Sequence, residues 1–186
     1  NQEIVLTSDG VSQWRYRTPF PHGKVTLTPP LSSGVLDPWI ITGPDGKAVA
    51  CTSATTSQCL QEAITHARNN GYNLEVLGDG VFDISGDPKH ALISSAPLTI
   101  GSIEANDFSF KNVNLYVNLG ARASCGLTFD SSEIFHFQFT GQFSYTGTGS
   151  AVCFAPVNAF PFDSGHSFQD NQVYFSNIAV AASVAA

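Results

Sequence analysis

The chain has 186 residues, which is enough for one domain with a sizeable core but not for two large ones. Hydrophobic residues make up 42% and charged residues only 12%, so we expect an ordered protein whose surface is built mainly from Ser, Thr, Asn and Gln. The net charge is −7, no basic cluster exceeds the pair Arg15 and Arg17, and no apolar run approaches the ~20 residues of a membrane span. These features exclude nucleic acid as a partner and exclude membrane insertion.

Residues 1–50 differ from the rest because they contain six of the ten prolines. Short alternating strand-like segments lie between the prolines, at 4–7, 14–17 and 24–28. This pattern is typical of edge strands and extended arms. Two interpretations stay open, a strand-rich lead-in region and an arm that docks on a partner, with Trp14, Tyr16 and Trp39 as interface anchors.

The cysteines are too few and too irregularly spaced for a disulfide scaffold, and no C-x-x-C motif is present. They are Cys51, Cys59, Cys125 and Cys153. A Cys51–Cys59 bridge is possible, but we predict free thiols, because unpaired Cys is usually buried.

Residues 55–70 have the pattern of a single helix of about four turns. Thr55 and Gln58 have the spacing of a capping box at its start, and Asn70-Gly71 supplies a left-handed stop. One face is apolar and is formed by Leu60, Ala63, Ile64 and Ala67. The opposite, solvated face is formed by Gln61, Glu62, Thr65 and Arg68.

After Gly71 the hydrophobic period changes to two, which predicts strands. Two strand-like pieces within 74–84 surround the turn Gly78-Asp79-Gly80, and further strand-like segments follow at 91–95, 97–103, 108–118, 126–132, 134–145, 151–156 and 171–180. Some resemble one another: 126–129 returns as 151–154, and 110–113 is similar to 137–140 and 168–171. Loose repeats of this length indicate a solenoid, with a β-sandwich as the alternative.

The segment 134–145 alternates aromatic and polar residues. We expect its Phe side to form an internal ladder, because alternate residues of a strand face opposite sides. An exposed aromatic ring could instead stack on a sugar, and Tyr145 and Tyr174 are the candidate binding residues.

The capped helix LQEAITHARNNG followed at once by LEVLGDGVFDIS resembles the N-terminal start of the right-handed parallel β-helix (pectate-lyase-like) superfamily, and most of all its phage tailspike and spike proteins. In that group an amphipathic helix covers the open first coil. Asp79 stands where the family usually has Pro. The resemblance implies an all-β fold: a right-handed parallel β-helix at 51–186 with one N-terminal capping α-helix, preceded by an extended strand-rich attachment arm at 1–50. We expect this to be the N-terminal part of a longer chain.

For β-helix enzymes, hydrolysis would need paired carboxylates, and elimination would need Ca²⁺-binding carboxylates with an Arg or Lys base. The candidate catalytic residues are Asp130, Glu133, Asp163 and Asp170. The basic residues Lys111 and Arg122 have no acidic cluster beside them in the sequence. The histidines show no H-x-H or H-E-x-x-H spacing, so we expect no metal and no cofactor.

Together these features predict a virion or extracellular spike or fibre protein, resembling phage spikes in being a homotrimer. Its partners would be other virion or particle proteins, contacted through residues 1–50, and host-surface polysaccharide. Two alternatives stay open, a polysaccharide lyase or glycoside hydrolase of the β-helix type and a capsid-attached decoration protein. We expect no enzymatic activity in this segment unless the four candidate carboxylates converge.

Overall fold

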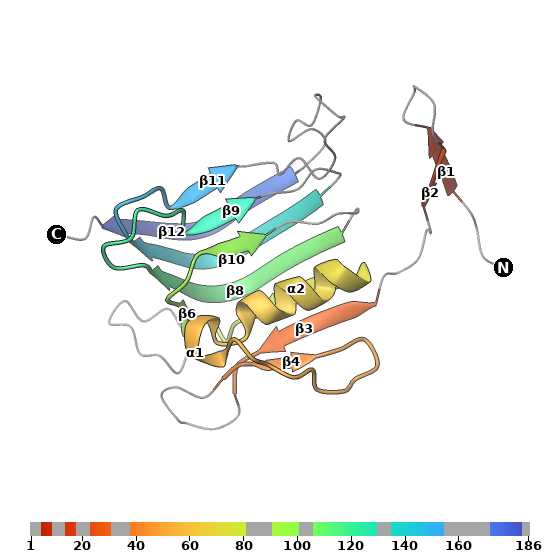
Figure 1. Cartoon of the computed structure of the whole chain (residues 1–186), viewed down its shortest axis with the longest axis horizontal. Helices are drawn as coiled ribbons and strands as arrows, with labels where there is room; N and C mark the ends of the chain where they lie inside the picture. Colours follow the sequence, from red (N-terminus) through yellow and green to blue (C-terminus); the bar gives the residue numbers. More distant parts are fainter. Residues whose placement is uncertain are drawn as a thin grey trace.

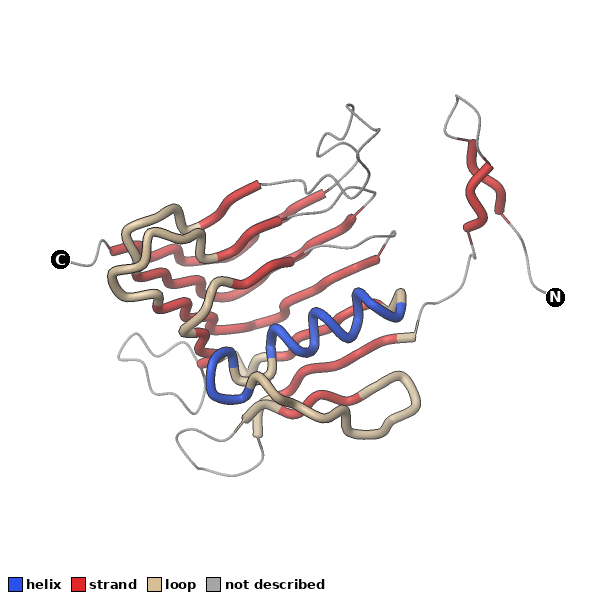
Figure 2. Tube along the Cα trace, in the orientation of Figure 1, coloured by secondary structure: helices blue, strands red, loops and turns tan. Residues whose placement is uncertain are grey.

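The computed structural model describes residues 5–8, 14–17, 23–30, 38–80, 91–100, 106–129, 135–154 and 172–183. These ranges are rich in strands, in agreement with the predicted all-β class, and the chain is drawn along its course in Figures 1 and 2. In chain order the elements are β1 (Val5–Ser8), β2 (Trp14–Arg17), β3 (Lys24–Thr28), β4 (Ile40–Thr42), α1 (Ala54–Ser57), α2 (Leu60–Asn70), β5 (Asn73–Leu77), β6 (Ala91–Ser94), β7 (Leu98–Ile100), β8 (Asn106–Asn118), β9 (Leu127–Phe129), β10 (Phe135–Thr146), β11 (Val152–Phe154) and β12 (Gln172–Ser183).

Most of these strands belong to one seven-stranded sheet, which we call the large sheet. Its order is β12-β10-β8-β5-β3-β4, and β6 also pairs with β8. The first half of β8 pairs with β5 and its second half pairs with β6. Every pairing is parallel except β3 with β4.

A second, small sheet has the order β11-β9-β7 and is parallel throughout. From β6 to β12 the chain alternates between the two sheets, and from β8 on each strand pairs with the strand that preceded it in this alternation in the same sheet. The two sheets lie one in front of the other in Figure 1. Parallel strands need such crossover connections, and here the second sheet supplies the crossing segment.

The hydrophobic core lies between the inner faces of these sheets. Phe137 of β10 packs edge to face on Phe129 of β9, with 5.0 Å between ring centroids. It also packs on Phe110 of β8 at 5.3 Å. The aromatic residues Phe137, Phe139, Phe143 and Tyr145 are all buried, which confirms the predicted internal ladder.

The long strands β8 and β10 both carry an irregularity near their middle. Their register shifts between Phe139 and Gly141, and Asn112 on β8 adopts a left-handed conformation with φ of 53°. Gly141 has φ of 130°, and a Cβ atom there would lie 2.1 Å from the backbone oxygen of Val113. Close backbone approach therefore requires glycine at this position.

The core extends into the region expected to be an attachment arm. Val25 and Leu27 of β3 and Trp39 and Ile41 around β4 are buried in it, and β3 pairs in parallel with β5. Trp39 is thus a core residue rather than an interface anchor. Only β1 and β2, among the described strands of residues 1–50, form a sheet of their own.

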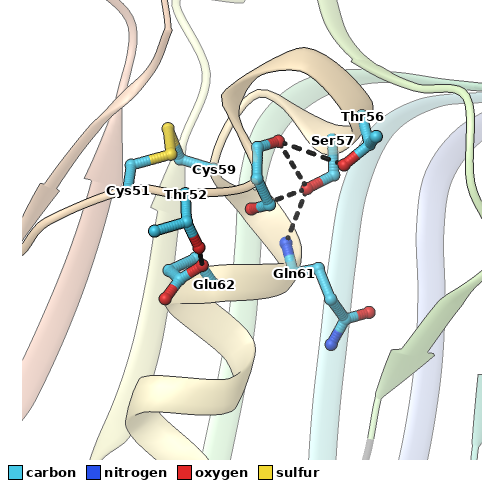
Figure 3. The surroundings of a disulfide bond; sticks show 8 residues. Cys51, Thr52, Thr56, Ser57, Cys59, Gln61 and Glu62 are labelled. Atoms are coloured by element: carbon cyan, nitrogen blue, oxygen red, sulfur yellow. Dashed lines mark hydrogen bonds between the residues drawn. A yellow bond between two sulfur atoms is a disulfide. The ribbon is translucent and has the colours of Figure 1, made fainter.

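The helical region also differs from the prediction, because it is two helices rather than one. Gln58 and Cys59 both have positive φ and separate α1 from α2. The expected capping box between Thr55 and Gln58 does not form. The Ser57 hydroxyl instead accepts a hydrogen bond from the backbone N–H of Gln61 at 3.2 Å, as Figure 3 shows.

The end and the buried face of α2 agree with the sequence, whereas Gln61, which was predicted to lie on the solvated face, contacts the backbone of β7. Gly71 has φ of 65°, and the backbone N–H of Tyr72 donates to Ala67 at 2.8 Å, a left-handed helix stop. The buried residues of α2 are Leu60, Ala63, Ile64 and Ala67, the same four that the spacing places on one face. This face packs against β3, β5 and β7, so α2 contacts both sheets.

The prediction of free thiols is wrong, because the structure contains two disulfides. Cys51 is bonded to Cys59 at the break between the helices (Figure 3), and Cys125 is bonded to Cys153 with 5.9 Å between their Cα atoms. Cys125 lies two residues before β9 and Cys153 lies in β11, the parallel neighbour of β9, so this bond joins segments with a sequence separation of 28.

Candidate functional site

The residues proposed for catalysis and sugar binding are not assembled into one site in the part of the chain that the structure describes. The carboxylates Asp130, Glu133, Asp163 and Asp170 lie outside the described residues. Tyr174 is paired with Gln138 in the backbone register of the large sheet, and its side chain is not described.

Tyr145 lies in the core rather than on a binding surface. Only 3% of it is exposed, its hydroxyl donates to the backbone oxygen of Ser124 at 2.8 Å, and the backbone N–H of Gly149 donates to that hydroxyl at 3.2 Å. Such a ring has no free face for a sugar, and its hydroxyl instead connects the loops that follow β8 and β10 by hydrogen bonds.

A different group of polar side chains lies on the outer face of the large sheet, at positions that alternate with buried ones. On β5, for example, Glu75 lies between the buried residues Leu74 and Val76. We call this group the polar face. It consists of Lys24, Thr26, Asn73, Glu75, Asp107, Ser109, Lys111, His136, Gln138 and Thr140.

Parallel register brings these residues into rows that cross four strands. One row runs from Lys24 through Asn73 and Asp107 to His136, and the next runs from Thr26 through Glu75 and Ser109 to Gln138. Strand neighbours lie about 4.8 Å apart, so side chains of one row are within contact distance.

Glu75 is the most enclosed charge on the polar face, with 14% of its side chain exposed. Lys24 donates to its Oε2 atom at 2.6 Å, and Lys111 donates to its Oε1 atom. The hydrogen bond from Lys111, followed by that from Lys24, lowers the pKa of the Glu75 carboxyl below its usual value. Glu75 is therefore a permanent carboxylate near neutral pH and is unsuited to act as a general acid.

The next row contains a second polar contact. Nδ1 of His136 lies 3.2 Å from Oδ1 of Asp107, and Nε2 of Gln138 lies 3.4 Å from Nε2 of His136. The side-chain oxygen of Asn73 accepts from the backbone N–H of Asp107 at 3.1 Å. Imidazole, carboxylate and amide groups from three strands are thus held beside one another.

No local pattern in the sequence predicts these contacts. Lys111 has no acidic cluster beside it along the chain, yet it meets Glu75 across the pairing of β5 with β8. An alternating pattern shows that Glu75 and Lys111 face outward, but only the register shows that they meet.

Chemically, the polar face offers hydroxyl, amide, imidazole, ammonium and carboxylate groups on a regular framework of strands. Such groups can donate and accept hydrogen bonds with a ligand rich in hydroxyls. Over the described residues, no group of three or more His, Cys, Asp or Glu side chains is placed to hold a metal ion. Over the same ranges, neither helix has the length and apolar character needed to cross a membrane.

Comparison of the chain with protein families, with curated proteins and with solved structures gives no match.

Proposed function

We propose that this chain is a parallel β-helix of the kind used in extracellular or virion spikes and fibres, and that it presents its polar face to surface glycans. The observation that carries the proposal is the alternation of parallel strands between two sheets from β6 to β12. A chain that returns each time to pair with its own previous passage makes successive coils, and a core between the two sheets fills their interior.

The pairing of equivalent segments supports such coils. Leu127 pairs with Val152 and Phe129 pairs with Phe154, so the repeat noticed in the sequence corresponds to adjacent strands. The larger passages β8 and β10 likewise pair along almost their whole length. In this proposal α1 and α2 close the first coil at the end where β3 and β4 lie.

The disulfides support a location outside the cell. Bonds such as Cys51–Cys59 and Cys125–Cys153 persist in oxidising compartments and on virion surfaces, and they are rare in the cytosol. Scarcity of charge suits a long-lived structural chain whose polar walls pack against other chains. We propose a homotrimer as the assembly, with neighbouring particle proteins contacted through residues 1–50.

Glycan adhesion is proposed for the polar face because its groups lie on the outer side of the sheet, are varied and are spaced by the register of the strands. Glu75 is held as a carboxylate by two lysines, and Ser109 and Gln138 lie in the same row. Sugar hydroxyls need both donors and acceptors, and this row offers both.

The test is binding of the purified chain to an array of cell-surface glycans, followed by calorimetry with the best ligand. Replacing Ser109 and Gln138 by Ala should weaken that binding by at least about tenfold, the loss expected for two polar contacts. The matched control, Asn69→Ala, removes an exposed amide from α2 and should leave the affinity unchanged. Binding that survives the double change, or no binding to any glycan, would remove the adhesive part of the proposal.

A lyase or glycoside hydrolase, and a decoration protein attached to a capsid, remain the alternative proposals. The enzyme alternative predicts release of sugar products that is abolished by neutralising Asp130 or Asp163. Sedimentation velocity of the purified chain tests the trimer independently of any ligand.

A further inference from the structure

The side chain of Gln61 on α2 contacts the backbone of β7 with both ends of its amide. Its Oε1 atom accepts from the backbone N–H of Thr99 at 3.0 Å, and its Nε2 atom donates to the backbone oxygen of Thr99 at 3.4 Å. One amide therefore satisfies both polar backbone groups of one strand residue. A neighbouring strand would offer the same two contacts.

The side of β7 on which this happens is its unpaired edge. The N–H of Leu98 donates to Gly126 at 2.9 Å, on the side where β9 lies. In a parallel strand, successive residues point their backbone groups to opposite sides. The groups of Thr99 therefore point away from β9, to the position where a further strand of the small sheet would pair.

The equivalent edge of β6 is closed in the same way. The backbone N–H of Ile93 donates to Oε1 of Gln58, and the N–H of Ser95 donates to the backbone oxygen of Thr56 at 2.8 Å. The opposite side of β6 is occupied by β8. The short segment of α1 and the residue after it thus stand where another strand would join the large sheet.

The segment that carries these contacts is fixed in place by independent interactions. The disulfide between Cys51 and Cys59 links the chain before α1 to the break between the helices, as Figure 3 shows. Leu60 and Ile64 of α2 are buried in the core. The positive φ of Gln58 and Cys59 directs the chain from α1 into α2. Gln58 and Gln61 are therefore positioned as parts of a rigid unit.

We propose that α1 and α2 form an end-stop against strand addition, in which Gln58 and Gln61 occupy the hydrogen-bonding positions that a strand from a second copy of this chain would use. Unpaired strand edges are templates for joining another chain, and proteins cover them to remain separate. The second copy is the relevant partner because it carries strands that already pair in parallel with β7 and β6 in this chain.

The test replaces Gln61 with Leu, which keeps much of the side-chain volume and removes both hydrogen bonds. We expect the amide of Thr99 to exchange about tenfold faster in dilute protein, the ratio that corresponds to one net hydrogen bond. At higher concentration we expect the variant to associate beyond the wild-type state in sedimentation velocity, and the Thr99 amide to regain protection in the associated form.

The control is Asn69→Leu, which introduces the same side chain at an exposed amide of α2. It should leave both the association state and the exchange of Thr99 unchanged. A Gln61→Leu protein that matches the wild type in both measurements would overturn the end-stop.

Wild-type protein provides a measurement that does not depend on the variant folding. The amides of Thr99, Ile93 and Ser95 should be as protected as that of Leu98, although they lie on strand edges. Exchange of the three at the rate of exposed amides would also overturn the proposal. Failure of glycan binding would leave these measurements unaffected, because the polar face and the end-stop lie on different elements.

Discussion

Removing the disulfide between Cys125 and Cys153 should cost more stability than removing the one between Cys51 and Cys59. The first bond closes a loop with a sequence separation of 28, and the second closes one with a separation of 8. Loop-closure entropy gives about 4 kcal/mol for the longer loop and about 3 kcal/mol for the shorter one. The difference of about 1 kcal/mol follows from loop length alone.

The assay is urea unfolding of two double variants, Cys125→Ala with Cys153→Ala and Cys51→Ala with Cys59→Ala, with circular dichroism as the probe. Mass spectrometry of the oxidised wild type first checks the pairing itself. Any pairing other than Cys125 with Cys153 would refute the loop-length comparison, because the loop with a sequence separation of 28 would not be closed. A smaller loss for the Cys125–Cys153 variant than for the other would refute the entropy argument.

Three further changes test the cap, the polar face and the irregular strands. Ile64→Asp should destabilise the chain by at least about 3 kcal/mol and cause aggregation, because it places a carboxylate where only 1% of the residue is exposed. The control Thr65→Asp, at the exposed neighbouring residue, should leave stability and solubility unchanged. A stable, monodisperse Ile64→Asp protein would contradict the role of α2 as a cap. Because the pKa of Glu75 is lowered in the folded state, its ion pairs stabilise the fold fully above the usual value of 4.5, and this contribution disappears as pH falls through the folded pKa. Glu75→Gln should therefore flatten the acid limb of a stability–pH curve, and an unchanged limb would contradict the role of the two flanking lysines. Gly141→Ala should lower the free energy of unfolding in urea by about 1–3 kcal/mol more than Gly120→Ala does, because both glycines have positive φ but only a Cβ at 141 would meet a backbone oxygen of β8. Equal losses of stability would argue against the close approach of β8 and β10.

Local patterns predicted the parts of the fold whose partners are close in sequence. The buried face of α2, its stop at Gly71 and the internal aromatic ladder of β10 depend on spacings of a few residues. The repeat of 126–129 in 151–154 could also be detected in the sequence, because the two segments have similar residues, and they pair without a register shift. In contrast, the similarity of 110–113 to 137–140 was misaligned, since Phe110 pairs with Phe139 rather than Phe137.

Contacts between residues far apart in the sequence could not be predicted from local patterns. The bond between Cys125 and Cys153 joins the loop before β9 to β11, and the contact between Glu75 and Lys111 joins the neighbouring strands β5 and β8. The break at Gln58 also has a tertiary cause, because its side chain bonds the edge of β6 instead of capping its own helix. Helical periodicity continues through this residue in the sequence and therefore gave one helix.

The pairing of helix and sheet at this end of the molecule follows from one physical requirement. Each strand in a stack of passages obtains half of its backbone hydrogen bonds from the passage before it, and the first passage has none before it. An apolar lid could shield the core there, yet it would leave the N–H groups of Ile93 and Thr99 covered without acceptors. The segment meets both requirements, because the apolar face of α2 covers the core while the amides of Gln58 and Gln61 reproduce the contacts of a strand. The residues of this segment that face the strands therefore have two separate functions. The apolar residues cover the core, and the amides form the backbone hydrogen bonds that a further strand would otherwise supply.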